Sequence, residues 1–147
     1  MSYTQIYYHI IFSSKNRQPV FDEVDRRKLY NYLWGILKSK KCYLYQMGGM
    51  EDHIHMLISL HPTASLSHLV RDLKTSSTAW IKKKRIFTNF SGWQMEYGAF
   101  TKSNIEKQQV INYIKNQKSH HKEESFLDEF KRLLHEEGIK FDEKYIS

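Results

Sequence analysis

The order in which strand-like and helix-like segments follow one another limits this chain to few folds. Segments rich in aromatic and β-branched residues are typical of strands, and apolar residues three and four apart are typical of helices. The predicted strands cover residues 3–13, 42–47, 53–60 and 93–100, and the predicted helices run from about 22 to 40 and from about 65 to 80. The order β-α-β-β-α-β matches the split βαβ, or ferredoxin-like, arrangement. We therefore predict an α+β fold in which an antiparallel sheet carries two helices on one face.

Residues that favour helix ends and turns divide the rest of the chain. Asp22 and Ser65 are predicted N-caps of the first two helices, and a Gly pair at 48–49 predicts a hairpin or a bulge between two strands. Asn104 is predicted to cap a third helix, and a charged helix over about 123–137 is predicted to end at Gly138. The length of 147 residues fits one domain, which we expect to span 1–147 with a core of about 3–121 and a helical extension of about 122–147.

The charge of the chain indicates a polyanionic partner. It has 23 basic and 16 acidic residues, a net charge of +7 and a pI near 9.4. Basic residues cluster in the body of the chain, whereas the stretch from 123 to 143 is mixed to acidic. A basic surface attracts nucleic acids through counterion release, although a basic protein without such a partner has the same composition.

The sequence also limits the compartment and the kind of metal site. No stretch has the length of a membrane span or the pattern of a signal peptide. The single cysteine, Cys42, excludes a disulfide or a thiolate metal cluster within one chain. We therefore expect a cytoplasmic protein, in which any metal is held by histidine, carboxylate or amide ligands.

Two pairs of residues have a spacing that suits chemistry. His53 and His55 are two apart in a predicted strand, so both imidazoles lie on the same face and form a partial site for a divalent ion. Tyr113 and Gln117 are four apart in the third predicted helix, so they are neighbours on one helix face. Spacing alone leaves other interpretations open: histidines that only make hydrogen bonds, and a tyrosine half-buried in the core.

The same residues stand in two segments that resemble a known family. The segment 51–58, with His53 and His55, resembles the His-hydrophobic-His motif of the HUH single-strand transposases. The segment 109–121, with Tyr113 and Gln117, resembles their tyrosine helix, in the single-tyrosine branch of insertion sequence 200/605 type, to which REP-associated tyrosine transposases are related. Weaker similarities lie at 8–21, 72–77 and 93–100, so the resemblance covers nearly all of the chain up to about residue 121.

This resemblance implies a reaction and a role for each residue. Tyr113 would be the catalytic nucleophile that attacks single-stranded DNA and leaves a 5′-phosphotyrosine and a free 3′-hydroxyl. His53, His55 and Gln117 would hold a divalent metal, Mg²⁺ or Mn²⁺, that polarises the scissile phosphate. The family's substrates are single strands with a hairpin, and its members are homodimers. By charge and position, the candidates for DNA-binding phosphate contacts are Lys15, Arg17, Lys74, Lys82 and Arg85.

Three other functions remain open from the sequence. A ferredoxin-like nucleic-acid-binding module would keep the fold without catalysis, although histidines replace the stacking aromatic residues such a module needs. A metal-dependent hydrolase would cut DNA with no covalent step. A domesticated relative would nick DNA without moving its own gene. The last helix is expected either to cover a dimer or to tether the tyrosine helix.

Overall fold

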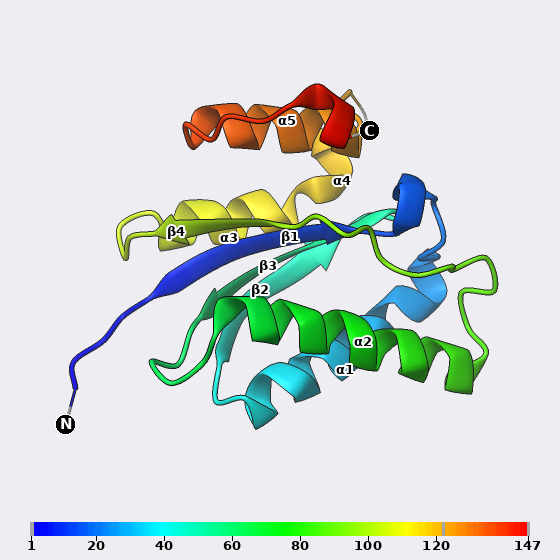
Figure 1. The fold of residues 1–147 in the computed structure, drawn as a ribbon, viewed down its shortest axis with the longest axis horizontal. Helices are drawn as coiled ribbons and strands as arrows, with labels where there is room; N and C mark the ends of the chain where they lie inside the picture. Colours follow the sequence, from blue (N-terminus) through cyan, green and yellow to red (C-terminus); the bar gives the residue numbers. More distant parts are fainter. Residues whose placement is uncertain (1, 122, 147) are drawn as a thin grey trace.

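A four-stranded antiparallel sheet forms the centre of the protein, as a computed structural model of the chain shows (Figure 1). The structure describes residues 2–121 and 123–146. In spatial order the strands are β2 (Tyr43–Gly49), β3 (His53–Ser59), β1 (Tyr7–Ser13) and β4 (Gly98–Lys102). Helices α1 (Glu23–Ser39) and α2 (Leu66–Lys84) connect them in the order β-α-β-β-α-β. The predicted α+β, ferredoxin-like arrangement is therefore confirmed.

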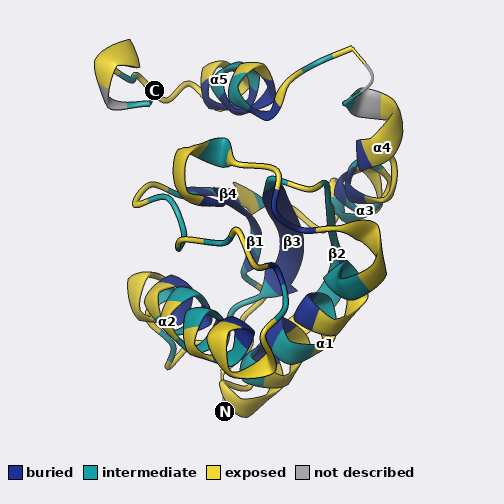
Figure 2. Cartoon of the chain, turned by 90° about the vertical axis from the view of Figure 1, so that its right-hand side faces the viewer, coloured by how far each residue is buried: buried dark blue, intermediate teal, exposed yellow. Residues whose placement is uncertain are grey.

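The sheet is covered on both faces, which explains why its central strands are apolar along their whole length. Alternate residues of β1 and β3 face α1 and α2, and Ile10, Phe12, Ile54 and Met56 are in that core. The residues between them face the opposite layer, which holds α3 (Lys107–Lys115), α4 (Gln117–His120) and α5 (Phe126–Glu136) (Figures 1 and 2). Side chains alternate between the two faces of a strand, so each central strand contributes to two cores.

Three predicted helix ends, at Asp22, Ser65 and Gly138, agree with the structure. Asp22 accepts a hydrogen bond of 2.9 Å from the backbone N–H of Asp25 and caps α1, and the Ser65 side chain caps α2. Gly138 follows the end of α5 with a φ of +70°, a left-handed conformation that glycine adopts without strain. Among the described residues no helix is both long and apolar enough to cross a membrane.

Four predicted boundaries are wrong. The first strand begins at Tyr7 and not at residue 3. The fourth begins at Gly98 and not at Trp93, because Trp93 forms only an isolated bridge with Ser14 before the chain crosses to the sheet edge. The third helix starts at Lys107 and ends at Lys115, so Asn104 is not its N-cap. The last helix starts at Phe126, after Ser125 as its N-cap, and not at residue 123.

The predicted hairpin is confirmed, because β2 and β3 pair antiparallel across a link at 50–52, and the Gly pair at 48–49 lies directly before that link. Both glycines lie inside β2, and the irregular pairing of this strand is near Leu44 instead. A Cβ atom on Gly48 would lie 2.9 Å from the carbonyl oxygen of Ile114, and one on Gly49 would lie 2.1 Å from that of His53. The absence of a side chain at Gly48 lets α3 approach the sheet closely, which brings the tyrosine helix to the histidine strand, and its absence at Gly49 leaves room for the His53 carbonyl.

Candidate metal and tyrosine site

The two histidines of β3 lie on one face of the sheet and are fully buried. His53 Nδ1 lies 2.6 Å from an Asp52 carboxylate oxygen, and His55 Nδ1 lies 2.8 Å from Nε2 of His9 on the adjacent strand β1. A partner on Nδ1 fixes the orientation of an imidazole ring and leaves Nε2 free to face a common target. Metal-binding histidines are commonly oriented in this way.

Gln117 supplies an amide oxygen to the same place. Its Oε1 is 2.8 Å from Nε2 of His53, and its side chain is buried. The expectation of one continuous helix through Tyr113 and Gln117 is wrong, because the helical turns break at Asn116 and Gln117 begins α4. Both side chains still reach one target, because each donates a hydrogen bond to the same oxygen atom.

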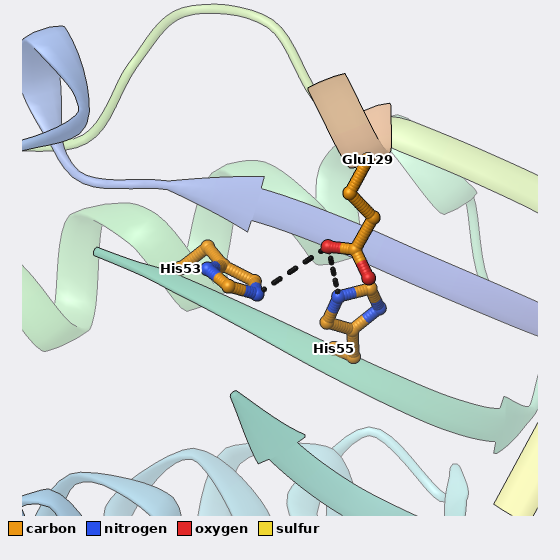
Figure 3. Close-up of side chains that lie close together, drawn as sticks. All are labelled: His53, His55 and Glu129. Carbon is orange, nitrogen blue, oxygen red and sulfur yellow. Dashed lines mark hydrogen bonds and ion pairs between the residues drawn. The ribbon is translucent and has the colours of Figure 1, made fainter. Parts of the chain in front are cut away.

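That target is Glu129, which the sequence analysis missed. The residue comes from α5 and its carboxylate points at the histidine pair (Figure 3). Its Oε1 lies 3.0 Å from His55 Nε2 and 3.5 Å from His53 Nε2, while its Oε2 accepts hydrogen bonds from Gln117 Nε2 at 3.1 Å and from the Tyr113 hydroxyl. One buried carboxylate therefore joins all four residues that the sequence had singled out.

A signal for Glu129 was present in the sequence. The residue is an acidic side chain among Phe126, Phe130 and Leu133, which form the buried face of a strongly amphipathic helix. Acidic residues in the middle of such a face are seldom fully buried unless they are paired. The charged residues of the segment predict a helix, and its single buried acid is identified only by its place on the apolar face.

The charges of these groups are set by burial and by their contacts. Burial, together with the nearby His55, holds the pKa of His9 well below its usual range, and burial lowers the pKa of His55 to about 4. Burial alone would raise the pKa of Glu129, but hydrogen bonds from His121 and His55 outweigh it, so this pKa lies well below its ordinary value. The site thus presents neutral imidazoles of His9 and His55 around an ionised carboxylate.

His121 is a further partner of the Glu129 carboxylate. Its Nε2 lies 3.1 Å from Glu129 Oε1 and 3.0 Å from Gln117 Oε1. Burial lowers the pKa of His121, but the hydrogen bond and charge of Glu129 raise it more, and the net shift is upward. A buried carboxylate needs hydrogen-bond or charged partners to offset its loss of water, and His121 is one of those partners here.

The donors fit a divalent ion. One atom each from His53, His55 and Glu129 lies within 4.8 Å of the others, and Gln117 Oε1 borders the same space. Bonds from nitrogen and oxygen donors to such ions are about 2.1 Å long, so ligand atoms around one ion are about 3–4 Å apart. Two imidazoles, a carboxylate and an amide oxygen form a mixed donor set that Mn²⁺ accepts readily and Mg²⁺ less so.

Tyr113 reaches this cluster from α3. The side chain is half-buried, its ring centre is 5.8 Å from that of His55, and its hydroxyl lies between Glu129 and Arg132. Arg132 Nη2 donates to the hydroxyl oxygen at 2.8 Å. Burial and then the Glu129 carboxylate raise the pKa of Tyr113, while Arg132 acts in the opposite direction.

The predicted DNA-binding residues lie in a short 3-10 helix after β1 and on α2 with its C-cap, outside the elements that carry this cluster. Lys82 and Arg85 are exposed at the end of α2. Lys15 and Arg17 lie in a short 3-10 helix after β1. Lys74 is half-buried and donates to the backbone carbonyls of residues 94–96, which indicates a structural role for its ammonium group.

Comparison with known proteins identifies the family of this chain. The fold and the buried histidine cluster define an α+β protein with a candidate metal site on its sheet. The sequence profile of the family described as "Transposase IS200 like" matches residues 2–117, and the chain belongs to that family.

Individual relatives agree with this assignment. The ISDra2 transposase TnpA of Deinococcus radiodurans is 28% identical over 118 residues, which cover 77% of this chain and 84% of that protein. The transposase for insertion sequence element IS200 of Salmonella typhimurium is 32% identical over 71 residues, about half of each chain (48% and 47%).

Two solved structures share the fold. A crystal structure described as a transposase from Deinococcus radiodurans has 25% identity and a TM-score of 0.59, and the match covers 79% of this chain and 93% of that one. The structure of a REP-associated tyrosine transposase bound to a REP hairpin has 14% identity and a TM-score of 0.63, and covers 82% and 72%. At that identity the second match supports the fold alone.

Proposed function

We propose that this transposase cleaves and rejoins single-stranded DNA through a covalent bond between DNA and Tyr113. The observation that carries this proposal is that the Tyr113 hydroxyl and Nε2 of His55 contact the same carboxylate. A free phenol is a weak nucleophile at neutral pH and needs a nearby positive charge to react as a phenolate. The position of Tyr113 beside a candidate metal site meets that need.

The reaction conserves bonds and charge. The Tyr113 oxygen forms a bond to phosphorus, the bond from phosphorus to the 3′ oxygen breaks, the phenol loses a proton and the 3′ oxygen gains one. Rejoining is the reverse with a new 3′-hydroxyl, so it needs no ATP. A phosphodiester has to reach the Tyr113 oxygen, so the hydrogen bond from this hydroxyl to Glu129 breaks before attack.

The metal belongs at the cluster of His53, His55 and Glu129, with Gln117 as a further donor. A bound Mg²⁺ or Mn²⁺ would polarise the phosphodiester and stabilise the charge that develops on its oxygens. The chain's own groups orient the site: Asp52 and His9 hold the two imidazoles by their Nδ1 atoms. His121, which now faces the carboxylate, would lose that role when an ion binds.

The predicted partner is a single strand with a hairpin, which agrees with the relative whose structure holds a REP hairpin. The predicted homodimer stays a prediction. Tyr113 and the histidine pair already meet within one copy of this chain, so a second copy would not be needed to complete the cluster.

The first experiment tests for the covalent bond. Purified protein is incubated with single-stranded DNA from both flanks of its gene, with Mn²⁺ or with EDTA, and products are resolved on a denaturing protein gel. We expect a metal-dependent shifted band that Tyr113→Phe abolishes. Tyr43→Phe, at an exposed tyrosine of β2, is the matched control and should keep the band.

Two outcomes would contradict the proposal. Cleavage without an adduct would support a metal-dependent hydrolase, and Tyr113→Phe would then cost little. Binding without cleavage, on flanks that include the element's ends, would support a binding module.

A further inference from the structure

The helix α5 lies beyond the segment that matches the family profile, yet it reaches the tyrosine. The profile ends at residue 117, and α5 covers Phe126–Glu136. We propose that Arg132 of α5 is a catalytic residue that contacts the Tyr113 oxygen and the phosphoryl group joined to it. This inference rests on the proposed function, because it needs a covalent bond at Tyr113.

The position of Arg132 is fixed by carboxylates. Its Nε and Nη2 each donate to Glu124 at 2.9 Å, its Nη1 donates to Glu136 at 3.1 Å, and Nη2 also donates to the Tyr113 hydroxyl at 2.8 Å. A planar guanidinium held by two partners has little freedom left, so its contact with the tyrosine is preorganised. Preorganised donors at a reacting oxygen contribute more to rate than donors that must first be ordered.

Arg132 also connects the tyrosine with the protein surface. Its side chain is 35% exposed and lines a pocket of about 770 Å³ together with Asn116, Ser119, Glu123 and Glu124. Tyr113 itself is half-buried, and the histidines behind it are fully buried. Arg132 therefore joins this pocket to the Tyr113 oxygen.

The chemistry of the intermediate suits a guanidinium. When the Tyr113 oxygen bonds to phosphorus, the nonbridging oxygens lie within about 3 Å of that oxygen, and an N–H now 2.8 Å from it can reach one of them. Arginine presents parallel N–H groups that match phosphate, whereas lysine offers a point charge. The same N–H stabilises the tyrosine oxygen when it leaves during rejoining.

The test measures single-turnover rates of adduct formation and of rejoining in Mn²⁺ for three variants. Removing one preorganised donor from a reacting oxygen costs about 100-fold in rate, so we expect about that loss in both directions for Arg132→Gln and a smaller loss for Arg132→Lys. Lys131→Gln removes the same charge from the neighbouring residue, whose ammonium faces Glu143, and should leave both rates unchanged. Mn²⁺ affinity and the unfolding midpoint should stay the same in all three.

The outcomes separate this inference from the proposed function. If wild type forms the adduct and Arg132→Gln forms it as fast as Lys131→Gln, the role of Arg132 is overturned while the tyrosine mechanism stands. If Arg132→Gln loses Mn²⁺ affinity in parallel with rate and Arg132→Lys restores neither, Arg132 only supports α5. If wild type forms no adduct, both proposals fail.

Discussion

At the scale of single residues, Glu129 is the one carboxylate of the candidate metal cluster among the described residues. Its carboxylate is fully buried, and His55, His53, Gln117 and Tyr113 contact it. We expect Glu129→Gln to weaken Mn²⁺ binding by 10- to 100-fold, roughly the loss seen when a group supporting a metal site is removed, because the variant keeps the shape and loses the charge. Isothermal titration calorimetry of the purified protein measures this directly.

Asp128→Asn is the control for Glu129, since Asp128 is an exposed carboxylate on the adjacent residue. Its loss should not change Mn²⁺ affinity. Equal affinities of wild type and Glu129→Gln would show that His53, His55 and Gln117 hold the ion without the carboxylate, which is the ligand set that the sequence predicted.

Local spacing determines where the four site residues named from the sequence lie, but it does not determine where Glu129 lies. Alternation along a strand placed His53 and His55 on one face, and helical spacing placed Tyr113 and Gln117 near each other. Their likeness to a family, rather than spacing, selected Tyr113 from ten tyrosines. Glu129 depends on how a separate helix docks on the sheet, and no local pattern determines that contact.

At the scale of elements, local signals predicted the side-chain caps of α1 and α2 at Asp22 and Ser65 but missed the Ser125 cap of α5. They failed where a tertiary contact decides, as in the late start of β4 at Gly98 and the break between α3 and α4 at Asn116. Gly98 lies close under α5: a Cβ atom there would be 2.8 Å from the ring of Phe130. The packing of α5 on the sheet therefore depends on a glycine at position 98 of β4 and on the Phe130 ring of α5.

This docking predicts the effect of a cavity under α5. Phe130 is buried with Ile11 and Phe100 and stacks on Phe126 at 5.7 Å. We expect Phe130→Ala to lower the free energy of unfolding by about 3 kcal/mol and to accelerate amide hydrogen exchange in α5 more than in β1. Chemical denaturation and hydrogen exchange measured by mass spectrometry check the two effects.

The matched control is Ile105→Ala, because Ile105 is 91% exposed and its truncation should change stability by about 0.5 kcal/mol or less. A loss for Phe130→Ala no larger than that of the control would mean that α5 is not packed on the sheet in solution. Glu129 and Arg132, which α5 carries, would then not be held beside Tyr113.

At the scale of the whole molecule, charge is divided between the body and the C-terminal extension. The segment 123–147 has eight acidic and four basic residues, so its formal charge is −4. The remaining residues have a formal charge of +11, which gives the net charge of +7. The basic body attracts phosphates, and the extension beside the tyrosine offers mainly acidic groups. We expect general affinity for DNA to come from the basic residues of the body.

Salt dependence tests which basic residues contribute. For single-stranded DNA, the logarithm of the binding constant falls with the logarithm of salt concentration by about 0.7 per neutralised phosphate. Exposed Lys82 and Arg85 at the end of α2 are candidates, so the double change to Ala should reduce the slope by about 1.4, measured by fluorescence anisotropy over a KCl series.

Lys140→Ala, in the acidic extension, should leave the slope unchanged. An unchanged slope in the double variant would remove the end of α2 from the DNA-binding surface, and the contact would then have to come from Lys15, Arg17 or the other basic residues of the body.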